Sequence, residues 1–224
     1  MNVSPGFAIA IDGPVGVGKS TVARKLAQEL QLTYIDSGAM YRAVALYNMR
    51  AGVAASDEAA IVASLPHIDI HLTPDSAIYM NGENVSAGIR NQALAEYTSS
   101  IAVYAAVREA MTAQQRDMAA ATSVVMDGRD IGSQVLPNAP IKIYLDADPT
   151  IRAQRRYREL IAKGQPAELS QVLAETLTRD HRDKNRAHAP LVQTDDAVYV
   201  DASHMNATET VAFIVEYVRQ FMQK

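Results

Sequence analysis

A glycine-rich segment near the start of the chain constrains its fold more than any other feature. Residues 13–20 are Gly-Pro-Val-Gly-Val-Gly-Lys-Ser, which fits a glycine, four residues and then Gly-Lys-Ser/Thr. Phe7–Ile11 before it predicts a buried strand, and Lys19–Leu30 after it predicts a helix with one apolar face. In that setting the backbone amides form a nest for phosphate at a helix N-terminus. The segment therefore predicts binding of a nucleoside triphosphate.

Two side chains at the end of this segment are expected to contact the phosphates and a metal ion. Lys19 is placed to reach the terminal phosphates, and the Ser20 hydroxyl is placed to face Mg²⁺. A chance glycine-rich turn is the alternative, and the strand–loop–helix context argues against it. The predicted ATP-binding residues are Gly13, Pro14, Val15, Gly16, Val17, Gly18, Lys19, Ser20 and Thr21.

Composition excludes several classes of protein. The 224 residues include no cysteine, which excludes a disulfide framework and thiolate chemistry, and 48% of them are hydrophobic, which is enough to bury a core. The first residues lack a basic segment followed by an apolar one, so we expect a cytoplasmic protein with no membrane association. The formal net charge of −4 argues against general nucleic-acid binding.

Apolar strand-like runs alternate with helical patterns along the chain, which predicts an α/β fold with a central parallel sheet. A C-terminal helix is expected after Asn206, because Glu209 follows at the spacing of a capping box. Between residues 68 and 85, apolar positions alternate around Pro74-Asp75 and Asn81-Gly82, which predicts a small antiparallel insertion. The strands expected after the first are Thr33–Ile35, Val124–Met126, Ile141–Leu145 and Val198–Val200.

Two further motifs follow expected strands, at the sheet edge where ligands of open α/β folds bind. In the first, Asp36-Ser37-Gly38-Ala39-Met40-Tyr41-Arg42, helix capping alone would explain the Asp-Ser pair, whereas the arginine could reach a bound phosphate. In the second, Asp127-Gly128-Arg129-Asp130, the first carboxylate is placed to hold the water shell of a metal ion. Arg129 suits a phosphate and Asp130 suits an amino group; a surface salt bridge is the alternative.

Arginines gather in two more groups. Arg179, Arg182, Asp183 and Arg186 have helical spacing, which predicts one shared helix face; an exposed face with ion pairs explains that spacing equally well. Arg152, Arg155, Arg156 and Arg158 follow the expected strand Ile141–Leu145. Two arginine groups beside one phosphate-binding loop favour phosphoryl transfer. The string Asn-Lys-x-Asp, which signalling GTPases need to read their base, does not occur in the sequence.

Together these motifs resemble the bacterial cytidylate kinases, members of the nucleoside monophosphate kinases. The resemblance spans nearly the whole chain, and the extra sheet expected at residues 68–85 is similar to one that marks that family. Val15 and Val17 stand where relatives commonly carry smaller or polar residues, which should leave the backbone contacts with phosphate unchanged. The matching segments are Gly13 to Thr21, Asp36 to Arg42, Val107-Arg108-Glu109-Ala110, Asp127 to Asp130, Arg155-Arg156 and the run from Arg179 to Leu191.

The resemblance implies a domain plan and an activity. Residues 1–224 would form one P-loop kinase domain of three layers, with a monophosphate-binding subdomain at 37–104, its insertion near 67–86 and a helical lid at 149–166. The implied reaction is the ATP- and Mg²⁺-dependent phosphorylation of CMP and dCMP to CDP and dCDP, in pyrimidine nucleotide metabolism. We expect a monomer that acts on these small molecules.

The resemblance also assigns residues. Ser37 and Asp183 would hold the ribose, Arg42, Arg129 and Arg179 the CMP phosphate, and Ser99, Arg108 and Asp130 the base. Catalytic charge would come from Lys19, Arg129, Arg155, Arg156 and Arg179, with Mg²⁺ near Ser20 and Asp127. The chemistry of cytosine fits this assignment, because its amino group can donate to a carboxylate. Uracil would set a carbonyl against Asp130, a mismatch that costs roughly 1–3 kcal/mol in a buried site.

Other classes of function predict different behaviour. A P-loop ATPase or switch protein would hydrolyse ATP slowly without an acceptor, and a nucleic-acid binder would show steep salt dependence. Within the kinases, UMP, dephospho-coenzyme A and shikimate are rival acceptors. The pair Asp130 and Arg108 is explained by a base-reading kinase and by neither of the other two classes.

Overall fold

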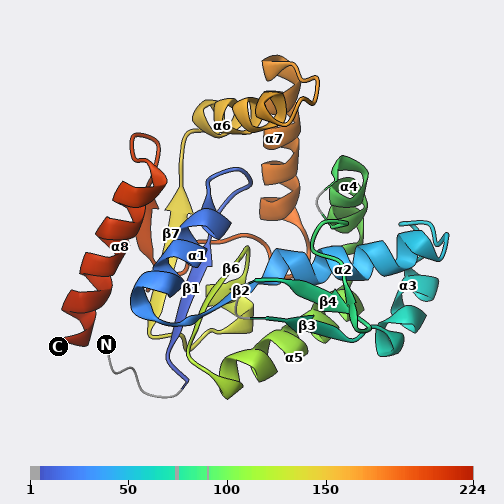
Figure 1. Ribbon diagram of the computed structural model, residues 1–224, viewed down its shortest axis with the longest axis horizontal. Helices are drawn as coiled ribbons and strands as arrows, with labels where there is room; N and C mark the ends of the chain where they lie inside the picture. The colour runs from blue at the N-terminus through green and yellow to red at the C-terminus, as the bar shows by residue number, and fades with distance from the viewer. Residues whose placement is uncertain (1–5, 74–75, 90, 224) are drawn as a thin grey trace.

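A five-stranded parallel sheet forms the centre of the computed structural model, which describes residues 6–73, 76–89 and 91–223 (Figure 1). The strand order is β2-β6-β1-β7-β8, and each neighbouring pair is parallel. The predicted α/β fold with a central parallel sheet is therefore confirmed. The strands are β1 (Ala8–Asp12), β2 (Thr33–Asp36), β6 (Val124–Gly128), β7 (Ile141–Asp146) and β8 (Val198–Asp201).

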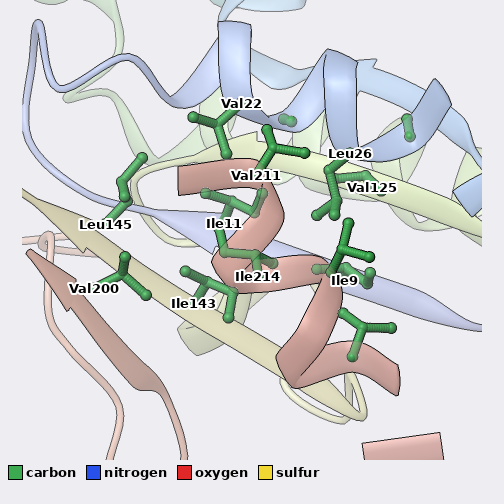
Figure 2. Packing of buried hydrophobic residues seen from close by; sticks show 14 of the residues in the cluster. Ile9, Ile11, Val22, Leu26, Val125, Ile143, Leu145, Val200, Val211 and Ile214 are labelled. Carbon is green, nitrogen blue, oxygen red and sulfur yellow. The ribbon is translucent and has the colours of Figure 1, made fainter. Parts of the chain in front are cut away.

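Helices cover both faces of this sheet, because successive strand residues point to opposite sides. On one face, α1 (Lys19–Leu30) and α8 (Ala207–Met222) pack together over β1, β7 and β8. Figure 2 shows Leu26 and Ile214 from these helices meeting Ile9 and Ile11 of β1. On the other face, α5 (Ala105–Ala121) and the short π-helix η2 (Ile131–Val135) pack against a second apolar layer. The predicted N-cap of the C-terminal helix is confirmed, with a complete capping box.

A second apolar cluster supports the expected insertion beside the main sheet. Its small antiparallel sheet has the order β3-β4-β5, as predicted for residues 68–85. Asn81 and Gly82 have φ angles of 50° and 79° at the turn after β4; the predicted turn at Pro74-Asp75 lies outside the described residues. The elements here are α2 (Ser37–Arg50), α3 (Glu58–Ser64), the 3₁₀ turn η1 (Leu65–His67), β3 (Ile70–Leu72), β4 (Ile78–Met80), β5 (Glu83–Asn84) and α4 (Gln92–Ile101). The subdomain bounds 37–104 stay a prediction.

Two helices form a hairpin at the carboxyl edge of the sheet (Figure 1). They are α6 (Pro149–Ala162) and α7 (Leu169–Asn185), and the two pack against each other. The expectation that four charged residues share one helical face needs correction: α7 ends at Asn185, and Arg186 lies beyond it in extended backbone, with φ −66° and ψ 146°. That residues 149–166 move as a lid stays a prediction. None of the described helices is long and apolar enough to cross a bilayer.

The strand register brings the two strongest motifs together. Ile11 pairs with Asp127 and Asp12 pairs with Gly128, so β1 and β6 end side by side. Because both strands run in the same direction, the loops that follow them leave from one edge of the sheet. The phosphate-binding loop and the segment 127–130 therefore share a single site.

Gly13 tests how tightly this edge is packed. Its φ is +153°, and a Cβ added there would lie 2.0 Å from the carbonyl oxygen of Leu145 in β7. We expect Gly13→Ala to lower the free energy of unfolding by about 3 kcal/mol or more, at the upper end for single substitutions. Gly164→Ala is the control, because its φ of +70° brings strain with no neighbouring heavy atom within 4 Å. That control should cost about 1 kcal/mol. Urea denaturation measures both, and equal losses would contradict the collision.

Candidate active site

The loop between β1 and α1 leads into the N-terminus of a helix. Gly16 and Gly18 have φ angles of +74° and +100°, which glycine adopts without strain. Gly18 is the N-cap of α1 and supplies no capping side chain, and the first turn of that helix contains no acidic residue. The first amides of a helix have no partner within it, so they remain available to an anion. The loop geometry thus fits the predicted phosphate site.

Lys19 lies across this loop. Its ammonium donates to the carbonyl oxygens of Gly13 and Pro14, both at 2.7 Å, and the side chain is buried. Burial lowers the pKa of Lys19, and the charge of the nearby Arg129 lowers it further. The loop lysine and an arginine of the second motif therefore lie close enough to repel each other.

Asp127 is the polar centre of the edge between β1 and β6. Its Oδ2 accepts from the hydroxyl of Ser20 at 3.0 Å, and its Oδ1 accepts from the hydroxyl of Tyr34 at 2.8 Å. Burial raises the pKa of Asp127 to about 6, and the charge of Asp36 adds to the effect. A cation beside this carboxylate would offset both the cost of burying its charge and the repulsion from Asp36.

The oxygen atoms of Asp127 and Ser20 are suitable ligands for Mg²⁺ that arrives with a nucleotide. Hydroxyl and carboxylate oxygens are the ligands this ion prefers, and it is commonly held by one or two protein oxygens together with substrate phosphates and water. No group of three or more His, Asp or Glu side chains in the described part of the chain could hold a metal ion by itself. Ser20 and Asp127 therefore fit the predicted metal site as partial ligands.

The start of α2 forms the next wall of the site. Asp36 is its N-cap, accepting from the amide of Ala39 at 2.8 Å, and also pairs with Arg42 at 3.1 Å. Ser37 is buried and donates to the carbonyl oxygen of Asp127 at 2.6 Å. The capping interpretation is thus correct for Asp36, and it does not account for Arg42, whose buried Nε has no hydrogen-bond partner.

Arginine–carboxylate pairs line the opposite wall. Nε of Arg129 donates to Asp183 of α7 at 2.7 Å, and Asp130 accepts a hydrogen bond from Arg108 of α5. Arg186 also approaches Asp130, at 3.5 Å. The base-reading pair predicted from the sequence is therefore in contact and buried, with one more arginine beside it.

Arg179 adds to a concentration of positive charge. Burial lowers its pKa to about 10, and the charges of Arg129, Arg42 and Arg182 contribute to the shift. Like charges this close repel each other, and a bound anion would offset that repulsion. The three arginines predicted to hold one phosphate are therefore brought to one place.

Other predicted site residues have different partners. The hydroxyl of Ser99 accepts from Arg182 at 2.8 Å, which joins α4 to α7. Arg155 donates to the carbonyl oxygens of Ala202 and Met205, at 2.6 and 3.2 Å. Arg156 pairs with Glu159 one turn along α6. These contacts do not join the three residues to the phosphate loop, and their roles in binding or catalysis stay predictions.

Several residues of the site were missed in the sequence. Asp12 accepts from the amides of Ile131 and Gly132, at 2.9 and 2.7 Å, and so anchors the segment after Asp130. Its only local signal is a position directly before the glycine-rich loop. Tyr34, Arg152, Asp180 and Arg186 were not assigned either, although the last three lie within arginine-rich segments that the sequence analysis had singled out.

Comparison with known proteins agrees with the geometry. The family model described as "Cytidylate kinase" matches residues 9–220. A cytidylate kinase of Pasteurella multocida (strain Pm70) is 41% identical over 219 residues, covering 96% of each chain. One of Solibacter usitatus (strain Ellin6076) is 46% identical over 213 residues, covering 94% of this chain and 91% of the relative. The structure of an uncharacterized protein from Eubacterium ventriosum ATCC 27560 is similar in fold, with a TM-score of 0.52 at 14% identity, covering 95% of this chain and 98% of that one.

Asp12 gives a pH test of the site. Burial raises its pKa from 3.8 to about 6, so the folded protein keeps a proton that the unfolded chain loses near pH 4. The contribution of this proton to stability is full below about pH 4 and is lost as the pH rises through 6. The free energy of unfolding of the parent minus that of Asp12→Asn should therefore fall between pH 4 and 7.

Urea denaturation across that range measures the difference. Asp148→Asn is the control, because hydrogen bonds from Thr150 lower the pKa of that exposed N-cap carboxyl. The stability that Asp148 contributes should instead be lost as the pH falls. A parent-minus-variant difference for Asp12 that stays flat with pH would contradict the burial of a protonated carboxyl.

Proposed function

Because the chain belongs to the cytidylate kinase family, we propose that it transfers the γ-phosphoryl group of ATP to CMP and dCMP. One observation carries the proposal within this structure. The parallel register of β1 and β6 brings Lys19 of the donor loop and Arg129 of the acceptor wall to one edge of the sheet, where burial and the charge of Arg129 lower the pKa of Lys19. The two phosphates of a transfer reaction would meet between them.

The donor side is the loop from Gly13 to Thr21. The amides at the start of α1 would hold the phosphates of ATP, with Lys19 at the terminal ones. Ser20 and Asp127 would hold Mg²⁺, which supplies positive charge to the transferring phosphoryl group when bound. The pKa of Asp127 is raised, which indicates that its carboxylate gains from a cation at this point.

The acceptor side would be formed by residues of α2, α7 and the segment that follows β6. Arg42, Arg129 and Arg179 would hold the phosphate of CMP, and Ser37 and Asp183 would hold its ribose. Asp130 would accept from the amino group of cytosine, with Arg108 donating to the ring acceptors and Ser99 completing the base contacts. Arg108 fixes one oxygen of the Asp130 carboxylate, which leaves the other oriented by a weaker contact with Arg186.

The reaction requires positioning and charge more than proton transfer. The attacking group is a phosphate oxygen whose second pKa is about 6, so it is already largely ionised near neutral pH. Alignment of the two phosphates and positive charge around the transferring group then supply the catalysis. Arg155 and Arg156 could contribute only after leaving their present partners, as closure of residues 149–166 over ATP would allow. A monomer in the cytoplasm stays the expectation.

An acceptor panel tests the proposed reaction. The protein is incubated with ATP, Mg²⁺ and each monophosphate in turn, with UMP and shikimate included, and ADP release is measured. We expect release to depend on CMP or dCMP. Turnover of another acceptor while CMP and dCMP are both inert would contradict the assignment. ADP release without any acceptor would favour an ATPase or a switch protein.

Specificity is tested at Asp130. Asp130→Asn replaces an acceptor with an amide that can donate to the carbonyl of uracil. The ratio of kcat/KM for CMP to that for UMP should therefore fall about ten-fold or more. Because the ratio compares two substrates on one preparation, a partly unfolded variant does not distort it.

Arg42→Ala is the matched control for this test. Arg42 pairs with Asp36 and would contact only the phosphate of the acceptor, so its loss should lower kcat/KM for CMP and UMP alike. An unchanged ratio in Asp130→Asn would remove that residue from base reading even if the kinase activity stood.

A further inference from the structure

A buried ion pair from the α6–α7 hairpin holds Val15 in the phosphate-binding loop. Oδ1 of Asp180 accepts from the amide of Val15 at 3.2 Å, and Nη1 of Arg152 donates to its carbonyl oxygen at 2.9 Å. The same Nη1 lies 2.7 Å from Oδ2 of Asp180, and the two side chains are only 3% and 10% exposed. Both backbone polar groups of one loop residue are thus bound by two helices that are distant from it in sequence.

This contact lies beside the groups that would hold ATP. Val15 directly follows Pro14, whose carbonyl oxygen accepts from the ammonium of Lys19. The next residue, Gly16, lies against Arg152, since an added Cβ would be 3.5 Å from Cβ of Arg152, an ordinary van der Waals contact. Arg152 itself is fixed at the start of α6 by donation from Nε to the carbonyl oxygen of Ala147 at 2.8 Å. The ion pair therefore sets the shape of the loop upstream of its lysine.

The same helix also reaches the acceptor side. Asp183 lies three residues after Asp180, on the same face of α7, and accepts from Arg129 at 2.7 Å. Arg129 belongs to the wall that would hold CMP. In Figure 1, α7 runs from α6 toward α2. Helix α7 thus contacts the donor loop through Asp180 and the acceptor wall through Asp183, one turn further along.

Stability alone is a weak reason for such a pair. Removing two charges from water is costly, and apolar side chains of similar volume often stabilise a protein as well or better. What the ion pair adds is a defined position of α7 against the loop, because both of its members also bind Val15.

From this arrangement we propose that Asp180 and Arg152 are positioning residues that couple the two nucleotide sites through α7. The inference rests on the proposed function. Contacts of CMP with Asp183 and Arg129 favour the position of α7 in which Asp180 and Arg152 hold Val15, and ATP binds the loop best in that form. By linkage, each nucleotide then tightens the binding of the other by the same factor.

Calorimetry of nucleotide binding tests the coupling directly. The probe is the Mg²⁺ complex of the β,γ-imido analogue of ATP, titrated into the protein with and without saturating CMP. In the parent, CMP should lower the Kd of the analogue about five-fold or more, and the analogue should lower the Kd of CMP equally. In Arg152→Met/Asp180→Leu, which removes both charges and leaves neither unpaired, the ratio should be close to one.

Two further variants guard the interpretation. Asp180→Asn keeps an acceptor for Val15 and loses the charge, so its ratio should fall between those of parent and double variant. Glu175→Gln makes the same chemical change on α7 at an exposed residue that accepts from Gln171 at 3.1 Å, and its ratio should equal that of the parent. Thermal unfolding of each variant checks that it is folded.

The outcomes separate coupling from structure and from function. A purely structural role would weaken both nucleotides and leave the ratio unchanged, which would overturn the proposal. So would a parent ratio of one, or a Glu175→Gln variant that loses coupling as the double variant does. If CMP does not bind the parent at all, the proposed function fails as well. If CMP binds and is phosphorylated while the double variant keeps the full ratio, only the coupling fails.

Discussion

Buried positive charge at the carboxyl edge of the parallel sheet is the constraint on which the rest of the site depends. Lys19, Arg129 and Arg179 lie close enough that the charge of Arg129 lowers the pKa of each of the other two. Holding them together costs free energy that the fold must offset. The parallel register of β1 and β6 allows it, because it brings the loops that carry Lys19 and Arg129 to one edge.

Carboxylates balance this charge and fix its geometry. Asp183 orients Arg129, Asp130 orients Arg108, and Asp127 joins the donor loop to β2 through Ser20 and Tyr34. Groups held in place before the reaction need no rearrangement as charge moves between the phosphates, which is how such sites stabilise a transition state. Burial and the charge of Asp36 raise the pKa of Asp127, which the charge of Lys19 and the two hydroxyl donors offset only in part.

Local sequence patterns predicted the fold well. The parts of the site that depend on contacts between distant residues could not be predicted in this way. The glycine-rich loop, the strands and the small insertion carry their signals within a few residues of each other. The hydrogen bond from Val15 to Asp180 joins residues 165 positions apart, so no local spacing could indicate it. Arg152 was grouped with the lid arginines on spacing alone, yet it is buried against the loop. Arg186 does not share the predicted helical face, because α7 ends one residue before it.

The distribution of charge also bears on which anions can enter. The chain has 25 acidic and 21 basic residues, yet Arg42, Arg129 and Arg182 all lie near Arg179. Positive charge gathered in a low-dielectric setting focuses the field and attracts small anions. A long polyanion would meet the acidic remainder of the surface at the same time. A mononucleotide is small enough to contact the arginine group alone, so we expect the overall negative charge to oppose a mononucleotide less than it opposes a nucleic acid.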